Sequence, residues 1–159
     1  MTVYEGARRD PGRTGGRYLV VVARFNRWIT DRLLEGAIRA FADAGVTADR
    51  VDVARVPGSL ELPAAARAGA ATGRYRAVAC LGAIIRGDTS HHAQVATGCV
   101  EGIQAAAIAT GLPITFGVIT ADTFDQAEAR SRLDGGRNLG ADAAAAAVEM
   151  ASLTDQLGR

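Results

Sequence analysis

One short segment, GAIIRGDTSHH, holds the residues best suited to acid–base chemistry. It contains the only two histidines of the chain, His91 and His92, and an imidazole can transfer protons near neutral pH. Gly87, Asp88 and Thr89 stand just before an expected helix, where free backbone N–H groups and the helix dipole favour an anion such as phosphate. The segment therefore predicts an anion beside a proton-transfer group, although an ordinary helix cap by Asp88 or Thr89 would explain the same residues.

An aromatic ring and a carboxylate stand in two other polar segments. Phe25 lies within ARFNR, so it is poorly placed for the core and could stack on a planar ring; packing against a helix is the alternative. Glu61 lies within VPGSLELP and could bind the hydroxyls of a sugar-like chain, or merely complement the dipole of its helix. These residue types would suit a ligand with a flat ring and hydroxyl groups.

Several classes of protein are disfavoured. The sequence has no GxGxxG, GxxxxGK[ST] or GxSxG motif, which argues against NAD binding, a P-loop and an α/β-hydrolase. Adjacent histidines rarely face one ion and no other ligand cluster supports them, so neither a metal nor a cofactor is expected. Cys80 and Cys99 lie in apolar runs without CxxC spacing, and we expect them to be small buried hydrophobes.

Charge and hydropathy favour a soluble cytoplasmic protein. The formal net charge is +1 and no basic block stands out, so nucleic acid is not an expected partner. All 18 positively charged residues are arginines, and hence no lysine can form a Schiff base. The N-terminus lacks an apolar signal core, and the longest apolar run, residues 77–85, is too short to cross a membrane.

Strand and helix patterns alternate along the chain. Apolar β-branched runs predict strands at 18–23, 50–56, 77–83 and 114–119. Helical spacing predicts helices at 31–44, from 60 to about 72, from after residue 92 to about 110, from 122 or 123 to about 130, and from after residue 140 to about 157. Gly45 is the expected C-cap of the first helix, and Ser59 the expected N-cap of the second. The alternation predicts a flavodoxin-like three-layer α/β/α sandwich with a four-stranded parallel sheet.

The topology places the chemistry at one edge of the sheet. Ligands of open parallel sheets bind beyond the carboxyl ends of the strands, where the segments with Phe25, Glu61 and His91 all fall. The length of 159 residues fits a single domain over 1–159. Residues 1–17 are expected to form an extended arm, in which Thr2 to Tyr4 could pair as an edge strand with a neighbouring subunit.

The motifs together resemble a known family. The blocks ARFN, VPGSLELP, LGAIIRGDTSHH, PITFGVITADTFDQAEAR and NLGADAAAAAVEM resemble 6,7-dimethyl-8-ribityllumazine synthases in order and spacing, from about Tyr4 to the C-terminus. The resemblance implies a transferase that condenses 5-amino-6-(D-ribitylamino)uracil with 3,4-dihydroxy-2-butanone 4-phosphate. The product is 6,7-dimethyl-8-ribityllumazine, with release of phosphate and water, in the penultimate step of riboflavin biosynthesis.

The resemblance implies a role for each candidate site residue. Those that match contacts to the pyrimidine and its ribityl chain are Phe25, Ser59, Leu60, Glu61, Ala83, Ile84, Ile85 and Phe116. Those that match contacts to the phosphate are Gly87, Asp88, Thr89 and Arg130. Phe25 matches the aromatic that stacks on the ring, Glu61 the group on the ribityl hydroxyls, and His91 the proton-transfer histidine.

The resemblance also implies that the site forms between subunits. Phe116 and Arg130 match residues that an adjacent subunit contributes, and members of the family are pentamers or larger assemblies of pentamers. Free pentamers, decamers and an icosahedral capsid all remain compatible with the sequence, and riboflavin synthase is a partner that a closed shell would allow.

Two departures from the family pattern leave an alternative open. His92-Ala93-Gln94 follow the histidine where most members carry an aromatic and an acidic residue. Asn138-Leu139-Gly140 stand where a lysine is usual, a charge that Arg132 or Arg137 could replace. The alternative is a paralogue that assembles and binds flavin-like ligands without turning them over. An unrelated flavodoxin-like phosphate-binding module is the third reading.

Overall fold

The computed structural model describes residues 1–10, 12 and 16–158. Residues 11 and 13–15 of the expected arm, and the last residue of the chain, lie outside the described residues. The strands are β1 (Arg17–Ala23), β2 (Val51–Val56), β3 (Tyr75–Ile85) and β4 (Ile114–Ala121). The helices are α1 (Arg27–Asp43), α2 (Leu62–Ala71), α3 (His91–Thr110), α4 (Phe124–Ala129) and α5 (Leu139–Gln156), with short 3₁₀ turns at Ala48–Arg50 and Ser59–Glu61.

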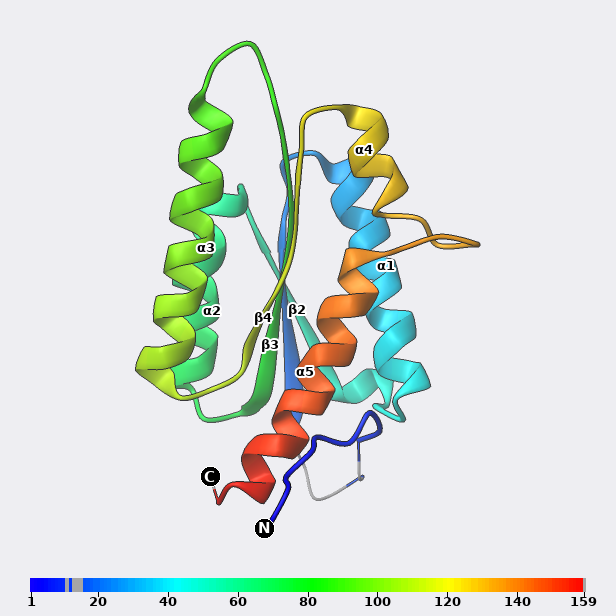
Figure 1. Cartoon of the computed structure of the whole chain (residues 1–159), viewed down its shortest axis with the longest axis vertical. Helices are drawn as coiled ribbons and strands as arrows, with labels where there is room; N and C mark the ends of the chain where they lie inside the picture. The colour runs from blue at the N-terminus through cyan, green and yellow to red at the C-terminus, as the bar shows by residue number, and fades with distance from the viewer. Residues whose placement is uncertain (11, 13–15, 159) are drawn as a thin grey trace.

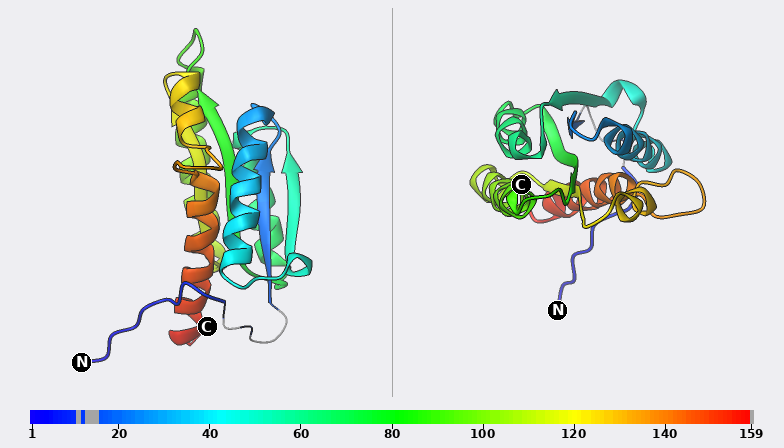
Figure 2. Two further views of the ribbon diagram at one scale, coloured as in Figure 1. Left: turned by 90° about the vertical axis from the view of Figure 1, so that its right-hand side faces the viewer. Right: turned by 90° about the horizontal axis from the view of Figure 1, so that it is seen from above.

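The strands form one parallel sheet in the order β2-β1-β3-β4. β1 lies between β2 and β3, so that Val20 is paired with Val53 on one side and Ala79 on the other. Helices cover both faces of the sheet, with α2 and α3 on one side and α1, α4 and α5 on the other (Figures 1 and 2). The predicted three-layer α/β/α sandwich is confirmed.

Alternating residues of the strands build two separate cores. Tyr18, Val20 and Val22 of β1 pack with α1, α4 and α5. Their neighbours Leu19, Val21 and Ala23 point to the opposite face and pack with α2 and α3. A sheet buried on both faces requires such continuous apolar strands, and that is why the runs were detectable in the sequence.

The cysteines belong to the second core. Cys80 and Cys99 are fully buried, free thiols. Burial disfavours the thiolate, which raises the pKa of Cys99 to about 11 and that of Cys80 further. Their prediction as small buried hydrophobes is confirmed.

Two predicted helix starts were wrong. Helix α1 begins at Arg27 rather than Asp31, because Asn26 adopts a left-handed conformation (φ 56°) that turns the chain directly from β1 into the helix. Ser59 does not cap α2: it opens the 3₁₀ turn, its hydroxyl caps no helix, and α2 starts at Leu62. Gly45, with a φ of 86°, follows the end of α1 as expected.

Two helices begin with side-chain caps. The Thr123 hydroxyl accepts a hydrogen bond from Gln126 N at 3.2 Å and caps α4, as one of the two predicted caps. Asn138 Oδ1 accepts from Ala141 N at 3.0 Å and caps α5. Asn138 Nδ2 also donates to the carbonyl oxygen of Arg32 at 3.1 Å, which ties the start of α5 to α1.

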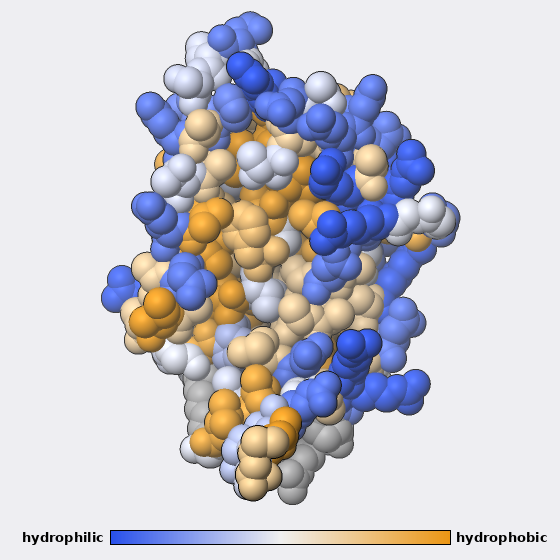
Figure 3. Space-filling model, in the orientation of Figure 1, coloured by the Kyte–Doolittle hydropathy of each residue, from blue (hydrophilic) through white to orange (hydrophobic). Residues whose placement is uncertain are grey.

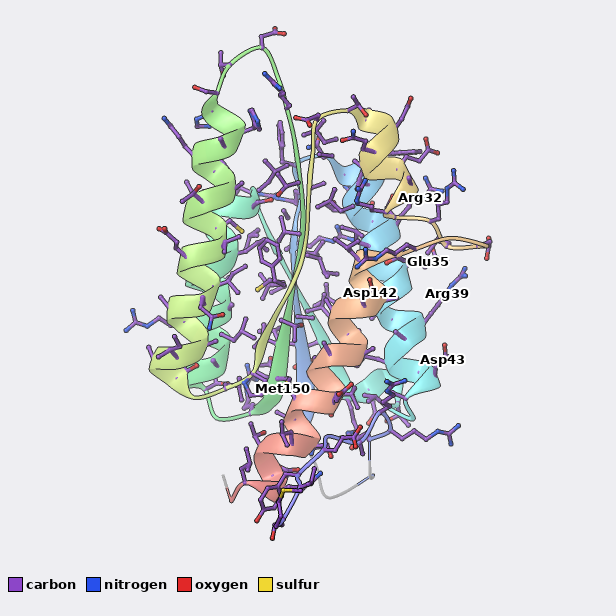
Figure 4. The ribbon with its side chains drawn as sticks, in the orientation of Figure 1. Arg32, Glu35, Arg39, Asp43, Asp142 and Met150 are labelled. Atoms are coloured by element: carbon purple, nitrogen blue, oxygen red, sulfur yellow. The ribbon has the colours of Figure 1, made fainter. Side chains whose placement is uncertain are left out.

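Ion pairs line the exposed side of α1. Arg39 pairs with Glu35 at 2.6 Å, and Arg32 lies 3.5 Å from Glu128 of the segment containing α4. Figure 4 shows Arg32, Glu35, Arg39 and Asp43 along this helix, on the side of the molecule away from α2 and α3. Exposed pairs of this kind contribute little to stability.

The described part of the N-terminal arm packs against the C-terminal end of α5. Ala7 N donates to the Ser152 hydroxyl at 3.0 Å, and Gln156 Nε2 donates to the carbonyl oxygen of Glu5 at 2.7 Å. Residues 2–4 form no strand within this chain. Their proposed pairing with a neighbouring subunit stays a prediction.

Candidate ligand-binding site at the carboxyl ends of the strands

A cavity of about 410 Å³ lies at the carboxyl ends of β1, β2 and β3. We call it the strand-tip cleft. It is lined by Phe25, Gly58, Ser59, Leu60, Glu61, Ala83, Ile84, Ile85, Gly87, Thr89, His91, His92 and Val95. Ten of these thirteen residues were predicted from the sequence as site residues, and the parallel topology is what brings them together.

Phe25 forms an exposed aromatic wall of the cleft. Its side chain is 70% exposed, which supports the expectation that it does not serve the core. The neighbouring Asn26 fixes the turn that presents it, because Asn26 Nδ2 donates to the carbonyl oxygen of Ala83 at 2.9 Å. This bond joins the end of β1 to the end of β3, so the aromatic ring and the floor of the cleft are held in one arrangement.

The 3₁₀ turn Ser59–Glu61 forms the second wall. Ser59 is buried beneath it, whereas Leu60 is exposed. Glu61 Oε2 accepts a hydrogen bond from the backbone N–H of Gly58 at 2.8 Å. The carboxylate therefore stabilises its own turn, and the second oxygen is the one left to meet a ligand hydroxyl.

The end of β3 forms an apolar floor. Ala83 and Ile84 are buried and Ile85 is half-buried. Pairing with β4 extends to Ile85, opposite Ala121, so this strand is longer than the sequence predicted. A flat, apolar ring could lie on this floor between Phe25 and the turn that contains Leu60.

The loop between β3 and α3 carries the polar end of the cleft. Gly87 and Thr89 line the cavity with both histidines. His91 is exposed and opens α3, and its backbone N–H points to the Thr89 hydroxyl at 3.4 Å. His92 is half-buried, and its Nδ1 lies 3.1 Å from the carbonyl oxygen of Thr89. This end can hold an anion close to an imidazole.

Three predicted site residues do not line the cleft of this chain. Asp88 is exposed on the same loop, next to the lining residues. Phe116 lies in the edge strand β4 and is 40% exposed. Arg130 is exposed at the end of α4, where its Nη1 donates to the carbonyl oxygen of Gln126 at 2.9 Å.

Four residues of the site were not among the binding and catalytic residues predicted from the sequence. His92, Val95 and Gly58 line the cleft, and Asn26 positions it. The signal for His92 was its place beside His91, and the signal for Asn26 was an asparagine between a strand and a helix, since asparagine tolerates left-handed backbone. Val95 carried no signal, because an apolar residue in a helix is ordinarily a core residue.

The described residues hold neither a cluster of metal-ligating side chains nor a membrane-spanning helix. No three His, Cys, Asp or Glu side chains gather there as a metal ion would require. Over the same residues, no helix has the length and apolar character to span a membrane.

The fold and the strand-tip cleft define a flavodoxin-like α/β protein with a small-molecule site. Residues 15–155 match the family model of 6,7-dimethyl-8-ribityllumazine synthase. The enzyme of that name from Anaeromyxobacter sp. (strain K) is 46% identical over 159 residues, covering 100% of this chain and 96% of the relative. Those from Xylella fastidiosa (strain 9a5c) and Desulfotalea psychrophila are 43% and 45% identical, covering 99% and 90% of this chain and 99% and 92% of the relatives. The chain belongs to the 6,7-dimethyl-8-ribityllumazine synthase family, whose members are transferases of riboflavin biosynthesis.

Proposed function

We propose that this chain condenses 5-amino-6-(D-ribitylamino)uracil with 3,4-dihydroxy-2-butanone 4-phosphate to give 6,7-dimethyl-8-ribityllumazine. The observation that carries the proposal is the strand-tip cleft, which combines Phe25, Glu61 and His91 in a chain of this family. The paralogue without turnover is not favoured, because the relatives are named as synthases and match this chain over nearly its whole length.

The pyrimidine is proposed to lie on the apolar floor at residues 83–85. Phe25 would stack on its ring, and the backbone of the floor would contact the polar edge. The ribityl chain would extend along Ser59 and Leu60 to the free oxygen of Glu61. This placement assigns the flat part of the substrate to the apolar walls and its hydroxyls to the carboxylate.

The phosphorylated ketone is proposed to lie at the loop end of the cleft. Gly87, Asp88 and Thr89 would hold its phosphate at the start of α3. The amine of the pyrimidine substrate attacks the ketone, so the reaction does not require an enzyme lysine. His91 would transfer protons during imine formation, before phosphate leaves and the ring closes.

The site is proposed to be completed by a second copy of the chain. Phe116 and Arg130 lie away from the cleft of their own chain, and both are exposed. β4 is an edge strand, and Figure 3 displays apolar surface on the face between α3 and α5 where this strand lies. Met150 of α5, labelled in Figure 4, is exposed on this face. A neighbouring subunit would cover this surface and receive Phe116 and Arg130 at its own cleft.

The assembly that we propose is a pentamer or a larger body of pentamers, in the cytoplasm. A closed icosahedral shell, with riboflavin synthase inside it, is the largest form that the family likeness suggests. Light scattering of the purified protein measures the size. A monomer at the concentration used for the assay would contradict the shared site.

The activity is tested by mixing the purified protein with both substrates and recording the fluorescence of the lumazine product. Formation well above the uncatalysed background is expected. A rate equal to the background would contradict the proposed reaction.

The shared site is tested by co-expressing His91→Ala and Arg130→Ala chains. Each variant alone is expected to be nearly inactive. In mixed assemblies with equal amounts of both chains, about one quarter of the sites would pair an intact cleft with an intact Arg130, because each of the two conditions holds for half of the subunits. Activity no higher than the mean of the separate variants would show that Arg130 acts elsewhere.

A further inference from the structure

The loop that carries the polar end of the cleft has few attachments. Residues 86–90 are all exposed, and in Figure 1 the chain between β3 and α3 projects beyond the end of the sheet. At its start, Arg86 N donates to the carbonyl oxygen of Ala121 at 2.9 Å. The Arg86–Asp122 pair beside it spans 3.6 Å between two largely exposed side chains, so it holds the loop weakly.

The loop also lacks a side-chain cap from the N-cap residue of α3. Ser90 occupies the N-cap position of α3, yet its side chain accepts no capping hydrogen bond, and the first turn of the helix has no acidic residue. No atom lies within 4 Å of the position that a Cβ at Gly87 would occupy. The other bonds of residues 87–90 are local: the Thr89 hydroxyl accepts from His91 N at 3.4 Å, and the Ser90 carbonyl oxygen accepts from Ala93 N at 3.0 Å.

His92 supplies the missing attachment. In the described part of the chain, it is the one side chain from outside residues 87–90 that forms a hydrogen bond with this loop, through Nδ1 and the carbonyl oxygen of Thr89 at 3.1 Å. A carbonyl oxygen only accepts, so Nδ1 must carry the hydrogen. His92 is half-buried whereas the adjacent His91 is exposed, which agrees with a ring held in place beside a free one.

This bond determines which way the loop presents its amides. In a planar trans peptide the carbonyl oxygen and the following N–H point in opposite directions. When His92 holds the Thr89 carbonyl toward its own ring, the N–H of Ser90 is turned away from the ring. Free N–H groups at the start of a helix are the groups that bind an anion.

We propose that His92 is a positioning residue, which holds the 87–90 loop through its Nδ1–Thr89 hydrogen bond in the conformation that binds the phosphate of the ketone substrate. The inference rests on the proposed function for the identity of that anion. It assigns the two histidines different tasks: His91 transfers protons, and His92 orders the loop beside it.

The test compares three substitutions of His92. Asparagine can place an amide N–H where Nδ1 lies, and so can keep the bond to Thr89. Glutamine places its amide near the position of Nε2 instead, and phenylalanine keeps the ring without any donor. His92→Asn and His92→Gln are thus a matched pair that differ in which nitrogen they replace.

The measurement is the KM for each substrate in turn, together with kcat. We expect His92→Gln and His92→Phe to raise the KM for the phosphorylated ketone by about three- to tenfold, the usual effect of losing one hydrogen bond. The KM for the pyrimidine and kcat should change by less than about twofold, and His92→Asn should restore the KM for the ketone. Inhibition by inorganic phosphate should weaken in the same order.

Other outcomes would overturn the inference. Equal effects of Asn and Gln, equal increases in both KM values, or an unchanged KM for the ketone in His92→Phe would each show that the Thr89 bond does not order the phosphate loop. Failure of the proposed function is a separate result, because the unsubstituted protein would then form no lumazine while its binding of inorganic phosphate could still be compared with that of His92→Phe.

Discussion

Adjacent histidines at the start of α3 meet different surroundings. The His91 ring is exposed at the cleft, and no side-chain hydrogen bond ties it within the described residues. A proton-transfer group needs this freedom, because it must bond to the reacting atoms rather than to the protein. His92 is tied to Thr89, and so is suited to order the loop instead.

Replacing His91 by alanine is expected to slow the reaction without abolishing it. Proton transfer by one placed group contributes about a hundred- to ten-thousand-fold, whereas holding two reactants together can contribute about 7–11 kcal/mol. Steady-state lumazine formation should fall by that first factor and stay above the uncatalysed rate. Complete loss of activity in a folded, assembled variant would contradict this ranking.

Replacing Asn26 by alanine is expected to destabilise the protein by about 2 kcal/mol. The change removes the bond to the Ala83 carbonyl and leaves a residue with a Cβ at positive φ, and each effect costs about 1 kcal/mol. Asn26→Gly is the control, since glycine accepts the backbone conformation and loses only the bond. In urea unfolding, the stability of Asn26→Gly should lie between that of the unsubstituted protein and that of Asn26→Ala. Equal stabilities of the two variants would contradict this explanation.

Most of the cleft could be predicted at the level of single residues. Phe25, Glu61 and His91 stood out because polar or aromatic side chains followed apolar strands. The bonds that hold them could not be predicted. Asn26 and Ala83 are 57 positions apart in the sequence. The Glu61 bond to Gly58 depends on a 3₁₀ turn where the sequence pattern predicted a capped helix.

At the scale of elements, α1 and α5 cross at very short range. A Cβ at Gly140 would lie 2.0 Å from the carbonyl oxygen of Leu33, and one at Gly36 would lie 2.3 Å from Asn138 Oδ1. The two glycines let the backbones approach, so that Asn138 can cap α5 and bond to α1 together. This crossing fixes where α5 begins, and with it the loop that follows α4.

Replacing Gly140 by alanine is expected to destabilise the protein by about 2 kcal/mol or more, because the methyl group would overlap the α1 backbone. Helix propensity alone would give the opposite sign, a gain of about 1 kcal/mol. Ala145→Gly, at an exposed position of α5, measures propensity alone and should cost about 1 kcal/mol. A Gly140→Ala variant that melts at or above the unsubstituted temperature would contradict the close crossing.

At the scale of the whole molecule, a buried ion cluster fastens the arm to the body. Asp10 has a fully buried carboxylate, with Oδ1 2.8 Å from Arg76 Nη1 and Oδ2 2.6 Å from Arg50 Nη1, the latter an ion pair without hydrogen-bond alignment. Arg76 also pairs with Asp155 in the last turn of α5. The cluster joins the arm, the start of β3 and the C-terminal helix. It therefore lies at the amino end of β3, whereas the cleft lies at the carboxyl end of that strand.

Replacing Asp10 by alanine is expected to destabilise the protein by about 3 kcal/mol, because two largely buried guanidinium groups would lose their shared carboxylate. The matched control is Asp134→Ala. The Asp134 side chain is 94% exposed and its carboxylate pairs with Arg39 at 3.5 Å, so its loss should change the free energy of unfolding by about 0.5 kcal/mol or less. Chemical unfolding measures both. Similar losses in the two variants would show that burial of the Asp10 cluster is not what matters.

The sequence by itself determined the layers and the order of the elements. Continuous apolar, β-branched runs such as residues 18–23 are typical of strands buried on both faces. Their alternation with helices predicts a parallel sheet, whose carboxyl ends gather the polar segments. Only the tertiary structure decided what holds the cleft: the turn at Asn26, the contact of His92 with Thr89, and the buried pairs of Asp10. The physical reason is that local patterns record which faces are buried, whereas hydrogen bonds and ion pairs between distant segments depend on distances that exist only after the sheet has formed.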